Sequence, residues 1–326
     1  MKKIVFVHNH LTSFVEIDLH ILRSQFETED CFVRSLKSIR PFQLFKKIAY
    51  SDLVFGWFSS WHTFLPVLFA KISGKPIVLI VGGYDTASIK ESSYGNQLVW
   101  YKRWITNWNI KQADALICNS NYIKQELHEI NTYFSKKANV IHHGIQAIPY
   151  PTDSKSRIVL NIGNVSSENL LRKGILPFVE TSKLLHEFKF IQFGKWRDDS
   201  YLTLKENAGK NCSILGLLND EDALKWKQSA SVYVQASSHE GFGMSVVESM
   251  QMGCVPVISK QGALPEVVRQ YGIYLENNTK ESIAEAILAA DRKTDQERKE
   301  IAEFVNSEYS IEKRKNAIIQ LVNKYL

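Results

Sequence analysis

Residues 237–258 read SSHEGFGMSVVESMQMGCVPVI. An apolar strand is predicted just before this stretch, at Val232–Gln235, and another at its end, at Val255–Ser259. Between them the glycines permit a tight turn, and a helix is predicted to begin near Met244. The order strand, loop, helix, turn, strand indicates a βαβ unit whose helix N-terminus lies at the carboxyl end of a strand.

The same alternation of short apolar runs and amphipathic stretches continues along the whole chain. Predicted buried strands are 4–7, 53–55, 76–81, 115–118 and 140–142 in the first half, then 157–162, 189–193, 212–215, 231–235 and 255–259. Predicted helices include residues 14–26 and a helix with Ser120 as N-cap that runs through Ile130. We therefore expect an α/β fold of two Rossmann-like, doubly wound domains facing a central cleft.

The polar, proline-rich residues 148–156 are typical of a linker. They divide the chain into an N-terminal domain, residues 1–148, and a C-terminal domain, residues 149–310. The basic amphipathic helix 311–326 is expected to pack back on the N-terminal domain.

Composition and charge narrow the class of protein. The 44% hydrophobic and 23% charged residues are ordinary for a globular chain. Four cysteines without a C-x-x-C motif favour a reducing cytoplasm, and no window approaches a membrane span. The net charge of +6 lies in residues 1–150, with 17 basic against 11 acidic residues, since 23 of each sign remain. A basic first half predicts an anionic partner: a membrane surface, a phosphorylated acceptor or nucleic acid.

Two glutamates stand on either side of the glycine turn. Glu240 belongs to the loop and Glu248 to the early helix, whose free N–H groups suit a diphosphate. Each carboxylate can accept two hydroxyl hydrogen bonds, as from a sugar or a ribose. An isolated pair at this spacing is more often a surface feature, but this pair lies in the restrictive pattern E-G-F-G…E-S-M-x-x-G-x-P-V-I.

That pattern resembles the signature of retaining glycosyltransferases of the GT-B fold, specifically those of family 4. Ile158–Gly163, followed by Arg172-Lys173-Gly174, resembles the glycine turn and phosphate-binding lysine of that family. Further matching landmarks follow in order at 113–120, 140–145, 190–194, 214–216 and 262–268.

The resemblance implies a role for each matching residue. Glu248 would bind the ribose, Glu240 the hydroxyls of the transferred sugar, and Lys173 the leaving diphosphate. The remaining donor-binding residues would be Gly163, Arg172, Gly216, Gly241, Phe242, Gly243 and Met244. The family retains anomeric configuration by front-face attack, with the leaving phosphate taking the acceptor proton. No protein nucleophile is then needed.

The chain also departs from the family pattern. Gly163-Asn164 replaces a frequent Gly-Arg, and Gly82-Gly83-Tyr84-Asp85 stands where many members carry a histidine. Asp85 is our candidate for contacting the acceptor hydroxyl; a turn-forming aspartate is the alternative. His8-Asn9-His10 replaces a glycine-rich loop, and we interpret these residues as hydrogen-bonded loop residues.

One acidic segment of the sequence bears on whether the protein requires a metal ion. Asp220-Glu221-Asp222 matches the metal-binding Asp-x-Asp pattern literally, but it opens a predicted helix, where acidic residues are favoured electrostatically. We expect no metal and no cofactor beyond the donor. A UDP-sugar is favoured because it is the commoner donor.

The N-terminal half has two basic aromatic clusters, residues 40–47 and 100–108. They suit an anionic membrane surface, although the tryptophans could equally pack inside. No nucleic-acid-binding module accompanies them, so nucleic acid is not expected. The predicted location is the cytoplasm, either free or at the inner membrane face.

The predicted function is transfer of a hexose-type sugar from a nucleotide sugar to a glycan or lipid-linked acceptor in cell-surface polysaccharide or glycolipid synthesis. Two alternatives stay open. One is a sugar-nucleotide epimerase or hydrolase of the same fold, and the other is a non-catalytic partner subunit of a glycosyltransferase.

Overall fold

A computed structural model describes residues 1–151 and 154–326 of the chain. These residues form two compact units. The first comprises Met1–Gly144 together with Tyr309–Leu326, and the second comprises Ile145–Glu308. Of the predicted linker, residues 152 and 153 lie outside the described residues.

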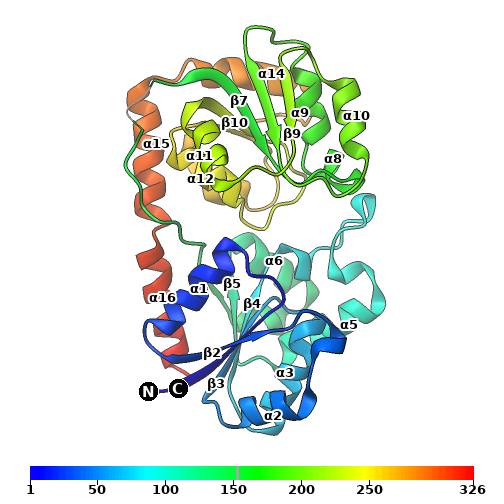
Figure 1. The fold of residues 1–326 in the computed structure, drawn as a ribbon, viewed down its shortest axis with the longest axis vertical. Helices are drawn as coiled ribbons and strands as arrows, with labels where there is room; N and C mark the ends of the chain where they lie inside the picture. The colour runs from blue at the N-terminus through cyan, green and yellow to red at the C-terminus, as the bar shows by residue number, and fades with distance from the viewer. Residues whose placement is uncertain (152–153) are drawn as a thin grey trace. The chain divides into compact units, whose positions relative to one another are not determined.

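The first unit is built on a parallel sheet of six strands in the order β2-β1-β3-β4-β5-β6 (Figure 1). The strands are β1 (Lys3–His8), β2 (Glu27–Phe32), β3 (Leu53–Trp57), β4 (Ile77–Val81), β5 (Ala115–Cys118) and β6 (Ala138–Val140). The helices are α1 (Ser13–Arg23), α2 (Pro41–Ala49), α3 (Trp61–Ile72), α4 (Gly83–Thr86), α5 (Trp100–Gln112), α6 (Asn121–Ile130), α7 (Thr132–Lys136) and α16 (Ile311–Asn323), with 3₁₀ turns at Leu36–Ser38, Lys90–Ser92 and Asn96–Leu98.

Helices cover both faces of this sheet. Alternate residues of the strands point to opposite faces, so Ile4 and Phe6 pack with α1 and α16, while Val5 and Val7 pack with α2, α3, α5 and α6. Each face carries its own core of buried apolar side chains. This is the doubly wound arrangement that the sequence predicts.

The strand β2 is one that the apolar runs do not predict. Its sequence ETEDCF alternates charged and small residues, and most of its side chains are partly or fully exposed. It pairs only with β1, at the edge of the sheet. An edge strand needs no continuous apolar run, because only part of its surface is buried.

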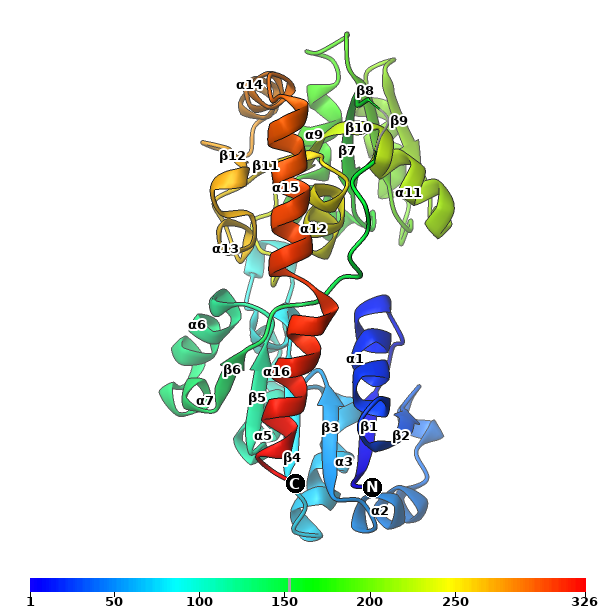
Figure 2. The same ribbon diagram turned by 90° about the vertical axis from the view of Figure 1, so that its left-hand side faces the viewer.

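The C-terminal helix α16 belongs to the first unit although it follows the second in sequence. Ile318 and Val322 lie in the core shared with α1. Arg314 forms a fully buried ion pair with Asp18 of α1, at 2.6 Å from Nε to Oδ1, and donates hydrogen bonds to the carbonyls of Ile141 and His142. Figure 2 shows α16 beside the strands of this unit.

The second unit repeats the architecture with a parallel sheet in the order β12-β11-β10-β7-β8-β9. Its strands are β7 (Ser156–Ile162), β8 (Lys189–Phe193), β9 (Cys212–Leu215), β10 (Ala230–Gln235), β11 (Val255–Ile258) and β12 (Ile273–Tyr274). Its helices are α8 (Ser167–Arg172), α9 (Ile175–Thr181), α10 (Ser200–Asn207), α11 (Asp220–Ser229), α12 (Met244–Gln251), α13 (Leu264–Val268), α14 (Lys280–Asp291) and α15 (Asp295–Glu308), with a 3₁₀ turn at Arg269–Tyr271.

The two sheets confirm the predicted α/β class and its two doubly wound halves. Five of the six strands in each sheet were predicted within one or two residues of the observed bounds. Within the described part of the chain, no helix combines the length and the apolar character that crossing a membrane requires.

Candidate functional site

The strand order of the second unit identifies where a ligand is expected. From β7 the chain proceeds to β8 and β9 on one side, and β10 returns to pair with β7 on the other. Doubly wound sheets bind ligands beyond the carboxyl ends of the strands at such a switch point. Gly163 follows β7 there, and the loop of residues 236–243 follows β10.

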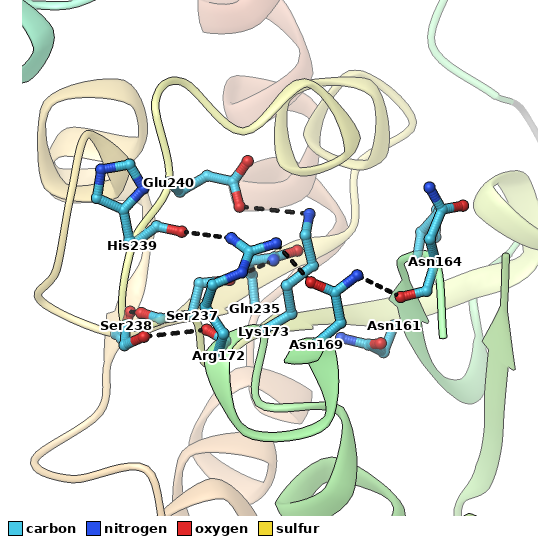
Figure 3. Close-up of polar contacts among 12 residues, drawn as sticks. Asn161, Asn164, Asn169, Arg172, Lys173, Gln235, Ser237, Ser238, His239 and Glu240 are labelled. Atoms are coloured by element: carbon cyan, nitrogen blue, oxygen red, sulfur yellow. Dashed lines mark hydrogen bonds and ion pairs between the residues drawn. The ribbon is translucent and has the colours of Figure 1, made fainter. Parts of the chain in front are cut away.

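Lys173 and Glu240 meet at this switch point (Figure 3). The Lys173 Nζ lies 3.6 Å from the Glu240 Oε2, and both side chains are largely buried. Gly174, the next residue, has a φ of +65°, and a Cβ there would lie 2.5 Å from the Cβ of Ala236. Glycine therefore allows the turn that carries Lys173 to approach the loop that carries Glu240.

The Glu240 Oε2 is buried and accepts no hydrogen bond from any described residue. An acceptor left in this state costs about 1–3 kcal/mol. A hydroxyl group of a ligand would restore the missing hydrogen bond, with Lys173 balancing the charge. This is the chemistry expected of a group that holds a sugar.

The loop around Glu240 is held in place by close backbone contacts. Gly262 has a φ of +63°, and a Cβ there would lie 2.6 Å from the Glu240 backbone nitrogen. The Ala263 N–H donates to the Glu240 carbonyl at 2.8 Å. Gly243, with a φ of +97°, caps α12, which begins at Met244 as predicted. The Gly241–Met244 backbone thus leads directly into a helix N-terminus.

Glu248 on α12 pairs with Lys227 on α11, with Nζ and Oε2 2.5 Å apart. The Lys227 side chain is 15% exposed and that of Glu248 is 35% exposed. Burial raises the pKa of Tyr233, as do the charges of Glu240 and, to a lesser extent, Glu248. Lys227 could not be predicted as a site residue, because a lysine on an amphipathic helix normally faces solvent.

Buried polar groups on the strands beneath the site were also not predicted. The Tyr233 hydroxyl donates to Gln235 at 2.6 Å, and Gln235 donates to Ser237 at 2.6 Å. Gln192 on β8 donates to the Gly163 carbonyl at 3.0 Å. A signal was available, since these polar residues interrupt apolar strand runs close to their carboxyl ends.

Arg172 precedes Lys173 in the chain, but only 7% of the Arg172 residue is exposed. Its Nη2 donates to Asn169 at 2.5 Å, and its Nε lies 3.4 Å from Glu168. Its Nη1 donates to the carbonyl of His239, the residue before Glu240. In this structure Arg172 therefore connects α8 to the loop that carries the carboxylate.

Gly163 and Gly216 follow β7 and β9, the two strands on either side of β8. Gly194 separates them: its N–H donates to the Gly216 carbonyl at 3.2 Å, and a Cβ on it would lie 2.1 Å from the Gly163 carbonyl oxygen. The side chain of Asn164 is exposed and accepts from the Lys195 N–H at 3.2 Å. The predicted donor residues on β7, β9 and α12 thus all lie at the same edge of the second sheet.

Asp85 lies in the first unit, where it lines a cavity of about 990 Å³. The residues around the cavity come from loops beyond the carboxyl ends of β1, β2, β3 and β4 and from α3 and α5. They are Asn9, His10, Arg34, Ser35, Lys37, Phe58, Ser60, Trp61, His62, Tyr84, Asp85, Asn96, Tyr101, Lys102 and Ile105. This is the switch point of the first sheet, where the chain leaves β1 for β2 and later returns to pair β3 with β1.

The Asp85 carboxylate is 1% exposed and accepts a hydrogen bond from the Gly82 N–H at 2.7 Å. Burial raises its pKa well above the ordinary range, against the opposing effect of the Gly82 and Ser59 backbone N–H groups. Asp85 lies in the short helix α4, where its carboxylate accepts from the N–H of the N-cap residue Gly82, and it also lines the cavity.

Comparison with known proteins now identifies the family. The family model described as Glycosyltransferase Family 4 matches residues 31–147, and that described as Glycosyl transferases group 1 matches residues 147–305. The chain belongs to this family of GT-B glycosyltransferases.

Individual relatives agree with the assignment. An uncharacterized glycosyltransferase of Methanocaldococcus jannaschii is 26% identical over 217 residues, which are 65% of this chain and 58% of that protein. O-antigen chain mannosyltransferase B of Escherichia coli is 35% identical over 95 residues, 28% of this chain and 25% of that protein. The matches therefore span less than two thirds of these relatives.

A solved structure shows the same fold over its full length. The Anabaena protein HepE, crystallised with UDP and glucose, superposes with a TM-score of 0.78 at 15% identity, covering 99% of this chain and 100% of that one. The likeness supports the GT-B fold of this family member.

Two departures of this glycosyltransferase from its family pattern have structural explanations. A Cβ at Gly82 would lie 2.5 Å from the ring of Phe58, which itself has a φ of +66°, so a histidine could not replace Gly82 without moving that ring. Both ring nitrogens of His8 are within hydrogen-bonding distance of neighbours, the His10 carbonyl and Asp30. His8 is hydrogen-bonded, as interpreted from sequence, but it is the last residue of β1 and does not belong to the loop.

The acidic run 220–222 opens α11 in this glycosyltransferase, as predicted. Asn219 is the N-cap and accepts from the Asp222 N–H at 2.8 Å, while Glu221 and Asp222 both lie within 3.5 Å of Lys225. Across residues 1–151 and 154–326, no three metal-ligating side chains of the His, Cys, Asp or Glu type gather into one group.

Proposed function

We propose that this protein is a retaining, metal-independent glycosyltransferase that transfers a hexose-type sugar from a UDP-sugar to a glycan or lipid-linked acceptor in cell-surface polysaccharide or glycolipid synthesis. One observation carries the proposal: a buried Glu240 oxygen without a hydrogen bond, 3.6 Å from Lys173, at the switch point of the second sheet. The hydroxyls of a neutral sugar can donate to Glu240, and the anionic leaving group can pair with Lys173.

The donor would lie entirely on the second unit. Lys173 neutralises the leaving diphosphate together with the N-terminus of α12, and Glu240 receives the sugar hydroxyls. Glu248, positioned by Lys227, receives the ribose hydroxyls. Gly163, Arg172 and Gly216 shape the edge of the site. UDP is supported by the fold likeness to a protein crystallised with UDP and glucose.

The acceptor would occupy the cavity of the first unit, with Asp85 facing its hydroxyl group. No residue is assigned as a nucleophile, because the leaving phosphate can take the acceptor proton during front-face attack. Retention then follows from attack on the face that the diphosphate leaves. No cofactor or metal enters these steps.

Nucleotide release from a panel of UDP-, GDP- and ADP-sugars, with and without membrane lipid extract, tests the proposal. Acceptor-dependent release with retained configuration of the product supports it. Conversion of the donor without an acceptor indicates an epimerase or hydrolase instead. Thermal stabilisation by nucleotide without turnover indicates a non-catalytic subunit.

A membrane-facing location at the inner leaflet is supported by the exposed side of α5. Trp100 is 75% exposed and Trp104, one helical turn later, is 57% exposed. Together with Arg103 and Lys111 they line a groove of about 580 Å³. Exposed tryptophans among basic residues suit an anionic lipid surface.

Co-sedimentation with phosphatidylcholine vesicles, with and without phosphatidylglycerol, tests this location. The variant Trp100→Ala/Trp104→Ala should lose most of its binding to the anionic vesicles. Leu288→Ala, which removes an exposed apolar side chain of α14, serves as the control. Equal sedimentation of all three proteins would rule out α5 as the contact surface.

A further inference from the structure

Three cationic side chains, those of Arg34, Lys37 and Lys102, are among the residues that line the first-unit cavity. Arg34 and Lys37 come from the segment after β2, and Lys102 comes from the first turn of α5. None of these three side chains forms an ion pair or a hydrogen bond with any residue in the described part of the chain. Three cations around one cavity repel one another, so this arrangement favours an anion between them.

The one carboxyl group among the lining residues does not balance these cations. Asp85 is buried, and its burial raises its pKa. Its Oδ2 is already engaged by the Gly82 N–H. The cavity therefore has an excess of positive charge that the protein itself leaves uncompensated.

The aromatic residues that line the cavity suit a sugar ring. Phe58, Trp61, Tyr84 and Tyr101 present aromatic surface, on which the apolar face of a pyranose can stack. His62 also lines the cavity. Its Nε2 donates to the Trp57 carbonyl at 2.7 Å, burial lowers its pKa to about 4, and its Nδ1 has no partner among the described residues.

We propose that this cavity binds an acceptor that carries a phosphate group beside a sugar ring, with Arg34, Lys37 and Lys102 neutralising the phosphate. Three cations match the charge of a phosphate ester better than that of a single carboxylate. A cavity of about 990 Å³ is large enough for a phosphorylated saccharide. The inference rests on the proposed function, because it names the class of acceptor that the transferase would use.

Two sources could supply this chemistry: a soluble sugar phosphate, or the phosphorylated head group of a lipid. Calorimetric titration of the full chain with glucose 6-phosphate represents the first source. Titration with monomeric octyl phosphate represents the second. Glucose and octyl glucoside are the neutral controls, and UDP is titrated into every variant to follow the donor site separately.

The test variant is Arg34→Gln/Lys37→Gln/Lys102→Gln. The matched control, Arg23→Gln/Lys71→Gln/Lys136→Gln, removes three exposed cations of the same unit that do not line the cavity. We expect the test variant to bind at least one phosphate probe about tenfold more weakly or worse, because it loses several charge-assisted contacts. The control variant and the affinity for UDP should be unchanged.

Three outcomes would each contradict a different statement: the acceptor class, the location of the site, or the proposed function. If UDP binds but neither phosphate probe does, the acceptor class is wrong and the proposed function stands. If the control variant weakens the probes as much as the test variant does, the effect is general charge attraction and the site is wrong. If UDP does not bind at all, the proposed function itself fails, whatever the probes do.

Discussion

The charged side chains at the two switch points are organised in opposite ways. In the second unit each of the two candidate site glutamates is paired with a lysine: Glu240 with Lys173, and Glu248 with Lys227. In the first unit the cations at the cavity have no such counterpart, and the nearby carboxyl is buried. A site with matched charges keeps its geometry without a ligand, whereas a site with unmatched charges gains most when a ligand brings the missing charge.

The largest effect is expected at Lys173, for which we propose a role in stabilising the leaving diphosphate. Lys173→Ala should lower kcat about 10²–10³-fold, because it removes one of the groups that stabilise the developing charge of the leaving diphosphate. The measurement is acceptor-dependent release of UDP. Lys183→Ala, at an exposed lysine of the same unit, is the control. Activity within a factor of about three of wild type would remove Lys173 from the mechanism.

A smaller effect is expected at the Lys227–Glu248 pair, which we propose binds the ribose. Glu248→Ala should weaken UDP binding roughly tenfold or more, since it loses hydrogen bonds to a charged acceptor. Lys227→Ala should weaken UDP binding only a few-fold and raise KM with kcat unchanged, because Lys227 acts by orienting Glu248.

Calorimetry on both single variants and the double variant checks this pair. If the loss of UDP-binding free energy in the double variant differs from the sum of the two single losses, the two side chains are energetically coupled. Unchanged UDP affinity in Glu248→Ala would show that the donor site lies elsewhere. A loss of kcat in Lys227→Ala would give that lysine a direct part in the reaction instead of a positioning role.

The smallest effect concerns the pH dependence of stability in the unmatched site. The folded-state pKa of Asp85 is raised, so the folded protein binds this proton more tightly than the unfolded chain does. The unfolding free energy should therefore fall as pH rises above the ordinary carboxyl range, by up to about 1.4 kcal/mol per pH unit, until the pH passes the raised pKa. Asp85→Asn should remove this slope.

Urea denaturation between about pH 4 and pH 8 measures the slope. Asp52 provides a control of opposite sign, since the Lys3 N–H holds the pKa of its carboxyl below the usual range. Its contribution is present above the unfolded-state pKa and is lost as pH falls. If Asp85→Asn and wild type show the same pH slope, the carboxyl of Asp85 is not destabilised by burial.

The contrast between the two sites also explains what the sequence could predict. The turn through Gly241 and Gly243 and the start of α12 depend on neighbouring residues, so local pattern sufficed. Glu248 was identified, but Lys227 was not, because the two are 21 positions apart and only tertiary packing joins them. The edge strand β2 was missed since its exposed, charged sequence lacks an apolar run.

The first-unit cavity could not have been assembled from sequence. Its lining residues range from Asn9 to Ile105 and come from six separate segments, none of which carries a distinctive motif. Asp85 was singled out because its segment stands where many members of the family carry a histidine, but nothing local indicated that Arg34 and Lys102 would line the same cavity. Local sequence pattern predicted the structure of one loop, but it could not group residues that only the fold brings together.

The return of α16 to the first unit makes the second unit a continuous insertion, residues 145–308, within a discontinuous host. Cutting the chain after Gly144 would separate Asp18 from Arg314 and leave a buried charge alone, at a cost of about 3–5 kcal/mol. Replacing only the inserted residues would leave that ion pair intact. Exchange of the second unit between relatives therefore requires two junctions, because a single junction would separate Asp18 from Arg314.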